Sequence, residues 1–216
     1  MADSAKEQSC KLYLLTPATI DAVRFAETLK RAIDFAPEIV GAVQLRLKDV
    51  SDDDFKRAAD ILMPVCHAFD LPLIINDRPD IAAAVGADGV HIGQNDTDYA
   101  TARDMLGADA IIGVTCHASR DLAIEAGDKG ADYVAFGAFF PSASKETKHQ
   151  ADPEIIEIWS SMTIVPCVAI GGITAENCPP LVDAGADYLA VISSIWAHPE
   201  GPEAGVRAFS GILKSA

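Results

Sequence analysis

The sequence predicts an α/β fold, a (βα)8 TIM barrel, in which residues 1–216 form a single domain. The first observation is an alternation of short apolar runs with amphipathic segments along the chain, which is typical of parallel strands joined by helices. The second is the tripeptide Gly-Ala-Asp, which recurs at 86–88, 107–109, 130–132 and 185–187 between a helical pattern and a strand. Its separations are 21, 23 and 55 residues, and 216 residues divided into eight units gives 27 residues per unit, which suits an eight-unit barrel.

The expected elements follow this spacing. The strands are 11–16, 42–48, 72–76, 89–93, 110–116, 132–140, 164–171 and 188–193. The helices are 19–35, 52–69, 80–85, 98–106, 119–128, 153–161, 175–184 and 203–214. Ser51 and Thr174 precede acid-containing first turns and are expected to cap their helices. A doubly wound open sheet would show the same alternation, but eight evenly spaced strands favour the barrel.

The composition limits what the protein binds. A net charge of −15 and a pI near 4.5 argue against non-specific binding to nucleic acid or to anionic membranes, which requires a basic surface. No run approaches the roughly 18–20 apolar residues of a membrane span, and the first residues lack the apolar segment of a signal peptide. The five cysteines form no CxxC motif, which argues against a disulfide framework or a zinc site. We therefore expect a reduced, soluble, cytoplasmic protein with small-molecule partners. The sequence leaves open whether the protein forms a homo-oligomer.

Residues 71–96 contain the clearest functional signal. An apolar run ends in Asn76-Asp77, a short helix begins at Pro79, and the next apolar run ends in Gln94-Asn95-Asp96. A βαβ crossover makes the two strands parallel neighbours, so Asp77 and Asp96 are delivered to the same end of the sheet. Two acids at one rim suit a hard cation or acid–base chemistry.

Strand 42–48 carries Gln44, Arg46 and Lys48 at a spacing of two, so the three side chains face the same side. If that side is the barrel interior, two cations lie near the mouth, where they need compensation by an anionic ligand. An outward, salt-bridged stripe beneath the helices is the alternative.

The ends of the later strands are also polar. Strand five ends with Thr115 and His117, and the loop after strand six contains Ser142, Ser144 and Lys145, the composition of a phosphate clamp. Strands seven and eight end in Gly171-Gly172 and Ser193-Ser194, where barrels bind phosphate with backbone N–H groups.

A metal ion would offset the repulsion between the two acids and the phosphates bound at the same rim. A phosphate about 4 Å from one carboxylate costs roughly 4 kcal/mol per pair of unit charges at an effective dielectric of 20. Two acids facing a diphosphate therefore require a cation, and Mg²⁺ fits best because it binds one or two carboxylates together with substrate phosphates.

Other reactive residue types have simpler interpretations. His91 lies in the middle of an apolar strand and is expected to be a hydrogen-bonded core histidine rather than a base. Cys116 is expected to be part of the core, and His117 a loop residue. GxSxG, HExxH and Walker A motifs are absent from the sequence.

Seven motifs in order resemble the thiamine phosphate synthase (thiamine-phosphate pyrophosphorylase) family. They are QLRLK (44–48), IINDR (74–78), GVHIGQND (89–96), IIGVT (111–115), FGAFFPSASK (136–145), AIGGIT (169–174) and VISSI (191–195). The resemblance implies a (βα)8 barrel that uses magnesium to join 4-amino-2-methyl-5-pyrimidinylmethyl diphosphate to a thiazole phosphate. The products would be thiamine phosphate and pyrophosphate, formed by a dissociative mechanism.

The resemblance also implies residue roles. Asp77 and Asp96 would bind the metal. The pyrimidine diphosphate would be held by Gln44, Arg46, Lys48, Asn76, Thr115 and Lys145, and the thiazole phosphate by Ser142, Ser144, Gly172, Ile192 and Ser193. Of these, Arg46, Lys48, Thr115 and Lys145 would act in catalysis.

The sequence departs from the family pattern at several positions. Leu47 replaces an acid, Ala138 a proline and Thr115 a serine, Ser142 and Ser144 replace threonines, and 146–153 lacks the usual glycine-bearing segment. Two alternatives stay open, a thiazole tautomerase-like isomerase and a non-catalytic binding paralogue. The isomerase would carry a histidine near position 138 and generally lacks the acid that Asp96 supplies.

Overall fold

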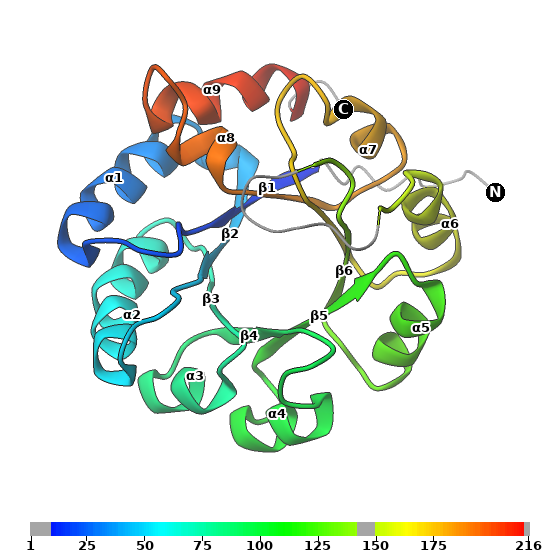
Figure 1. Cartoon of the computed structure of the whole chain (residues 1–216), viewed down its shortest axis with the longest axis horizontal. Helices are drawn as coiled ribbons and strands as arrows, with labels where there is room; N and C mark the ends of the chain where they lie inside the picture. The colour runs from blue at the N-terminus through cyan, green and yellow to red at the C-terminus, as the bar shows by residue number, and fades with distance from the viewer. Residues whose placement is uncertain (1–9, 142–149, 214–216) are drawn as a thin grey trace.

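The computed structural model describes residues 10–141 and 150–213 and shows a closed barrel of eight parallel strands, ordered β1 to β8 (Figure 1). The strands are β1 (Lys11–Leu15), β2 (Val40–Leu45), β3 (Leu73–Asn76), β4 (Gly89–Ile92), β5 (Ile111–His117), β6 (Tyr133–Gly137), β7 (Cys167–Ile170) and β8 (Tyr188–Val191). Each pairs with its sequence neighbour, and β8 closes on β1. The predicted barrel is confirmed, and the open sheet is excluded.

Helices surround the strands. They are α1 (Ala22–Phe35), α2 (Asp52–His67), α3 (Pro79–Val85), α4 (Tyr99–Leu106), α5 (Arg120–Asp128), α6 (Glu154–Met162), α7 (Pro179–Asp183), α8 (Ser193–Trp196) and α9 (Pro202–Leu213), with a 3₁₀ turn η1 (Pro37–Ile39). The last helix, α9, packs beside α1, so the outer ring closes as the sheet does (Figure 1). None of the helices described is long and apolar enough to cross a membrane.

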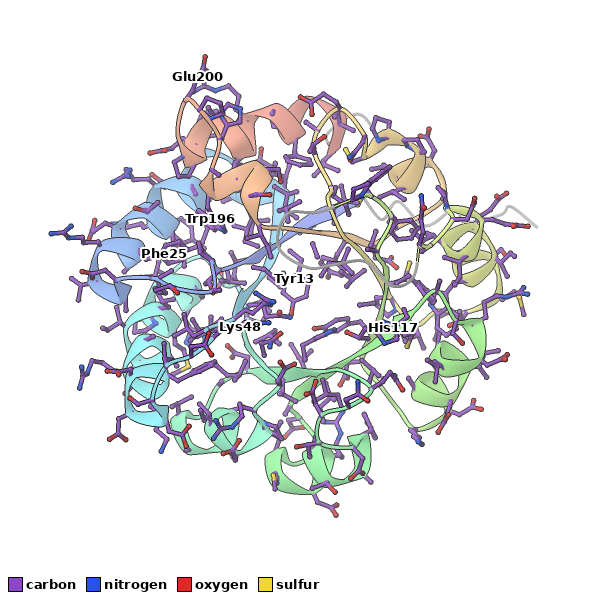
Figure 2. All side chains as sticks on the ribbon, viewed as in Figure 1. Tyr13, Phe25, Lys48, His117, Trp196 and Glu200 are labelled. Atoms are coloured by element: carbon purple, nitrogen blue, oxygen red, sulfur yellow. The ribbon has the colours of Figure 1, made fainter. Side chains whose placement is uncertain are left out.

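Two apolar layers hold the barrel together. The larger lies between the strands and the helices, and the smaller fills the barrel with inward residues such as Tyr13, Ile74, Tyr133 and Val168. Figure 2 shows Tyr13 inside the ring of strands, whereas Trp196 lies outside it. The alternation of inward and outward side chains along each strand follows from the strand period of two.

The Gly-Ala-Asp repeat has a defined structural role. Gly86 ends α3 in the left-handed conformation (φ 65°), as expected of a helix C-cap glycine. Three of the repeat aspartates accept a backbone N–H near the start of the preceding strand, each at 2.8 Å: Asp88 from Leu73, Asp132 from Ile112 and Asp187 from Cys167. These aspartates therefore join neighbouring strands by hydrogen bonds at the amino-terminal end of the barrel.

Strand 2 differs from its predicted range of 42–48. It begins two residues earlier, at Val40, and ends at Leu45, so Arg46 and Lys48 lie just beyond the strand. The reason is that the Arg46 N–H donates to the Thr16 hydroxyl at 2.9 Å instead of continuing the sheet.

The cap predicted at Thr174 is wrong, whereas that at Ser51 is confirmed. Ser51 accepts the Asp54 N–H at 3.1 Å. The Thr174 N–H donates instead to the Asn177 side chain at 2.8 Å in a loop that delays α7 until Pro179. Proline is favoured there because the first helical N–H has no partner within the helix.

Candidate active site

The polar side chains converge at the carboxyl-terminal ends of the strands. Gln44 is 3% exposed and donates from Nε2 to the Tyr13 hydroxyl at 3.0 Å, which places it inside the barrel. Thr115 follows Ile111 in the inward alternation of β5. These positions exclude an outward-facing stripe for Gln44.

Asp77 and Asp96 lie together at this mouth. The two carboxyl groups are within hydrogen-bonding reach of each other. Burial first, and then the neighbouring charge of Asp96, raise the pKa of Asp77 to about 6. The Asn76 side chain, through a hydrogen bond, and the charge of Arg46 oppose this rise in the pKa. The expected carboxylate pair is therefore present, and Arg46 acts on it electrostatically.

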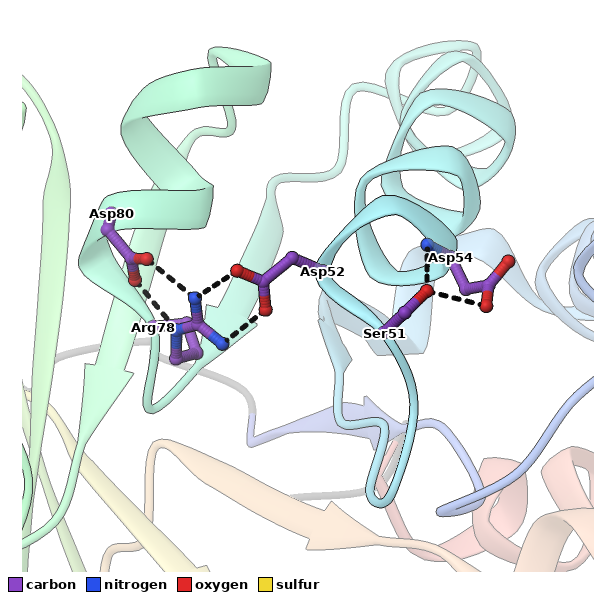
Figure 3. A network of polar contacts seen from close by, with 5 residues as sticks. All are labelled: Ser51, Asp52, Asp54, Arg78 and Asp80. Atoms are coloured by element: carbon purple, nitrogen blue, oxygen red, sulfur yellow. Dashed lines mark hydrogen bonds and ion pairs between the residues drawn. The ribbon is translucent and has the colours of Figure 1, made fainter.

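Backbone geometry fixes Asp77. Its φ is +63°, in the left-handed region, and its N–H donates to the His91 carbonyl at 2.8 Å, which extends the pairing of β3 with β4. The next residue, Arg78, forms hydrogen bonds of 2.6–3.0 Å with both Asp52 and Asp80 (Figure 3). Arg78 thus ties the turn that carries Asp77 to the start of α2.

A tight turn fixes Asp96. Its carboxylate accepts the Gly93 N–H at 2.8 Å, and its own N–H donates to the Gly93 carbonyl at 3.2 Å. A Cβ at position 93 would lie 2.7 Å from the Asp96 carboxylate, so glycine is needed for this arrangement. Beside it, Gln94 donates from Nε2 to the Thr115 carbonyl at 2.6 Å.

Lys48 is exposed, and its N–H donates to the Ala18 carbonyl at 2.9 Å. Figure 2 shows it at the edge of the ring of strands, near β3. Arg46 is half-buried. The two cations therefore flank the mouth on the side of β2.

His91 is a core histidine, as the sequence indicates. It is 8% exposed, and both ring nitrogens are hydrogen-bonded, to Tyr133 and to Thr115. Burial lowers the pKa of His91 to about 4, so the ring is neutral at pH 7. Cys116 is fully buried, and burial raises the pKa of its thiol to about 12, which excludes a thiolate nucleophile at neutral pH.

The second anion site is described only in part. Ser142, Ser144 and Lys145 lie outside the described residues. Gly172 has φ +61°, and a Cβ there would overlap the Pro141 carbonyl oxygen, so the β6–α6 loop approaches it closely. Ile192 precedes α8, and its carbonyl accepts the N–H groups of Ile195 and Trp196. The N–H of Ser193, at the start of α8, has no acceptor within the helix.

Some polar side chains of the barrel were not predicted from the sequence. Tyr13 and Tyr133 lie in apolar strand segments of the sequence and were expected only to pack in the core. In the structure their hydroxyl groups form a hydrogen bond of 2.8 Å inside the barrel. Ser194 Oγ is the one buried side-chain polar atom without a hydrogen-bond partner within residues 10–141 and 150–213. Gly113 is a signal that could have revealed the position of Tyr133. A glycine inside a strand often marks the close approach of another group, which here is the Tyr133 ring.

A cavity of about 220 Å³ lies at the amino-terminal ends of the strands and is lined by Tyr13, Tyr133 and Tyr188. Its position agrees with the role of that barrel face in stability rather than chemistry.

The fold and the mouth together define the class: a (βα)8 barrel whose polar side chains, a carboxylate pair among them, gather at the end where barrel enzymes have their active sites. The family model described as thiamine monophosphate synthase matches residues 12–195. A thiamine-phosphate synthase of Rhodospirillum centenum is 56% identical over 95% of this chain and 98% of that protein, and one of Erythrobacter litoralis is 46% identical over 95% and 96%. The chain therefore belongs to the thiamine monophosphate synthase family, and it is a transferase of thiamine biosynthesis.

A solved structure agrees with this assignment. The thiamine phosphate pyrophosphorylase from Pyrococcus furiosus superposes with a TM-score of 0.82 at 27% identity, covering 96% of this chain and 97% of that one.

Proposed function

We propose that this chain joins 4-amino-2-methyl-5-pyrimidinylmethyl diphosphate to a thiazole phosphate, giving thiamine phosphate and pyrophosphate. The observation that supports it most is the contact between Asp77 and Asp96 at the barrel mouth beside Arg46. Two carboxylates this close to each other, within the electrostatic influence of a cation, suit a metal-bridged diphosphate.

The residues present fit magnesium. Burial and Asp96 raise the pKa of Asp77, which means that the two negative charges are poorly compensated by the protein itself. Within the described parts of the chain, no group of three or more His, Cys, Asp or Glu residues could hold a metal. A carboxylate pair alone matches Mg²⁺, which keeps waters and takes its other ligands from substrate phosphates. When bound by Asp77 and Asp96, the ion would neutralise charge on the departing diphosphate.

The protein side chains would position the substrate and its leaving group. Arg46 and Lys48 would bind the diphosphate oxygens, and Asn76 and Thr115 would donate further hydrogen bonds. Lys145, outside the described residues, would add a cation from the β6–α6 loop. The thiazole phosphate would be held by Gly172, Ile192 and Ser193 together with Ser142 and Ser144.

The reaction would proceed in two steps. The bond between the pyrimidinyl methylene carbon and the diphosphate oxygen breaks first, and its electron pair leaves with pyrophosphate. The lone pair of the thiazole nitrogen then forms the new carbon–nitrogen bond with the pyrimidinylmethyl cation. The described cysteines are buried, so catalysis by leaving-group stabilisation and orientation is favoured over a thiolate nucleophile.

The alternative isomerase has no support at position 138. The residue there is Ala138, and a Cβ on Gly171 would overlap it, so this part of the chain is tightly packed. We therefore do not propose the tautomerase reaction.

The test is turnover with both substrates and MgCl₂, followed by detection of thiamine phosphate and pyrophosphate. We expect both products in equal amounts, and Asp77→Asn should lower kcat/KM about 100-fold or more with the fold retained. Asp60→Asn, an exposed acid on α2, is the matched control and should retain activity. Binding of both substrates without product would instead indicate a non-catalytic paralogue.

A further inference from the structure

A chain of hydrogen bonds crosses the barrel interior from Gln44 to Thr115. Gln44 Nε2 lies 3.0 Å from the Tyr13 hydroxyl, and this hydroxyl lies 2.8 Å from that of Tyr133. The Tyr133 hydroxyl lies 2.9 Å from His91 Nδ1, and His91 Nε2 lies 2.8 Å from Thr115 Oγ1. The chain thus connects two groups at the substrate end of the barrel through three aromatic rings beneath them.

The sequence makes room for this chain at Gly113. In the strand register, Gly113 on β5 stands between His91 on β4 and Tyr133 on β6. A Cβ at position 113 would overlap the Tyr133 ring, so the glycine lets that ring lie across β5 and reach His91. The rings are also packed: Tyr133 stacks on His91 at 5.5 Å and meets Tyr13 edge-on at 5.8 Å.

One direction of the chain starts at Gln44. Gln44 Nε2 can only donate, so the Tyr13 oxygen accepts from it, and in the direction that continues the chain the Tyr13 hydroxyl donates to Tyr133. Tyr133 then donates to His91 Nδ1. The neutral imidazole carries its one proton on Nε2, which donates to Thr115 Oγ1.

The two ends are therefore coupled. In this direction the Thr115 hydroxyl proton is available to a substrate oxygen, and Gln44 turns its Oε1 acceptor away from Tyr13. If Gln44 rotated its amide by half a turn, every bond in the chain would reverse, and Thr115 would donate to His91 instead. An anionic diphosphate needs a donor at Thr115, so it favours the first direction.

We propose that Tyr13, Tyr133 and His91 are positioning residues that set the orientation of the Gln44 amide and the Thr115 hydroxyl together. The proposal rests on the proposed function, since it takes Gln44 and Thr115 as substrate-binding residues. Its consequence is a site that presents an acceptor at Gln44 and a donor at Thr115 before substrate arrives, without reorganisation.

A double-mutant cycle tests the coupling in kcat/KM. Tyr133→Phe keeps the ring and removes the linking hydroxyl, and we expect about a tenfold loss, the effect of one oriented hydrogen bond. In a Thr115→Val background the same change should cost less than threefold, whereas in Thr115→Ser, which keeps the hydroxyl, the tenfold loss should return. A purely structural role would give the same loss in every background.

Tyr188→Phe is the matched control. Tyr188 also packs on the barrel interior, but it is not part of the chain, so activity should stay within twofold of the wild type. The proposal is overturned if Tyr133→Phe behaves like Tyr188→Phe, or if it costs threefold or more in the Thr115→Val background. Should Tyr133→Phe not fold, Tyr13→Phe breaks the adjacent bond and serves in the same cycle.

A second measurement does not depend on turnover. Nitrogen-15 NMR of histidine-labelled protein reports which ring nitrogen carries the proton, and His91 is the signal that persists when the other four histidines are replaced by asparagine. We expect the proton on Nε2, and a proton on Nδ1 overturns the proposal. A protein that shows this tautomer but makes no thiamine phosphate contradicts the proposed function alone.

Discussion

The backbone N–H of Gly93 donates to the Asp96 carboxylate at 2.8 Å, and this bond orients the acid that meets Asp77 across the barrel mouth. The turn from β4 thus carries half of the candidate metal site. Its geometry depends on a glycine, because a side chain at position 93 would occupy the space of the carboxylate.

Gly93→Ala should therefore impair activity more than stability. The new Cβ would lie 2.7 Å from the Asp96 carboxylate and displace it, and we expect kcat/KM to fall about 10- to 100-fold. The control is Gly211→Ala on α9, where a Cβ meets nothing within 4 Å. It should leave kcat/KM unchanged and raise the free energy of unfolding by about 0.5–1 kcal/mol. Equal activity of the two variants would contradict the role of Gly93.

The raised pKa of Asp77 predicts a pH-dependent contribution to stability. Its pKa is about 6 in the folded protein, against 3.8 for an ordinary aspartate, so folding favours the protonated acid. This contribution is present below about pH 4 and is lost as the pH rises through 6. The urea midpoint of the wild type should therefore fall relative to that of Asp77→Asn between pH 4 and pH 7. A constant difference between the two proteins would refute the assignment.

Magnesium should restore the stability that is lost when Asp77 ionises. At pH 7 the proposed ion would bind the ionised pair, so MgCl₂ at about 5 mM should raise the Tm of the wild type. Asp77→Asn should show a smaller rise, because it retains only Asp96. Differential scanning fluorimetry with and without EDTA measures both, and CaCl₂ at the same ionic strength separates ion specificity from screening.

Arg78→Lys should loosen the turn that holds Asp77. The guanidinium spans Asp52 and Asp80 with a fork that an ammonium group does not reproduce (Figure 3). The network is partly exposed, so we expect the free energy of unfolding to fall by only about 0.5–1 kcal/mol. The KM for the diphosphate substrate should rise several-fold. Arg57→Lys, in an exposed pair with Asp54 at 3.4 Å, should change neither quantity.

Gly172→Ala tests the second anion site. Position 172 combines a φ of +61° with close contact to the Pro141 carbonyl, so alanine adds backbone strain and a clash. We expect a loss of about 1–3 kcal/mol in stability and a higher KM for the thiazole phosphate. Gly86→Ala, where φ is +65° and a Cβ would meet nothing within 4 Å, isolates the backbone strain. If both variants lose the same stability and keep the wild-type KM, the close approach at Gly172 has no functional role.

The sequence was informative wherever a local rule determines the structure. Alternating strands and helices predicted the barrel, and the run into Asp77 and then Asp96 predicted two acids at one rim, because parallel neighbours end on the same side. Ser51 was recognisable as a cap since its own hydroxyl accepts the bond.

The remainder depends on register and on contacts between distant segments. Strand 2 ends at Leu45 because Thr16, 30 residues away, takes the Arg46 N–H. The delayed start of α7 depends on the Asn177 side chain, which accepts the backbone N–H of Thr174. Tyr13 and Tyr133 are 120 residues apart, and only the closed barrel brings their hydroxyl groups together.

Asp77 and Asp96 are proposed to hold a cation through which the barrel mouth binds a diphosphate. Calorimetric titration of inorganic pyrophosphate into the protein, with and without Mg²⁺, tests it most directly. We expect pyrophosphate binding to weaken at least tenfold when Mg²⁺ is removed, with a matching loss in Asp77→Asn and Asp96→Asn when Mg²⁺ is present. Pyrophosphate affinity that is the same with and without Mg²⁺, and unchanged in both variants, would contradict it.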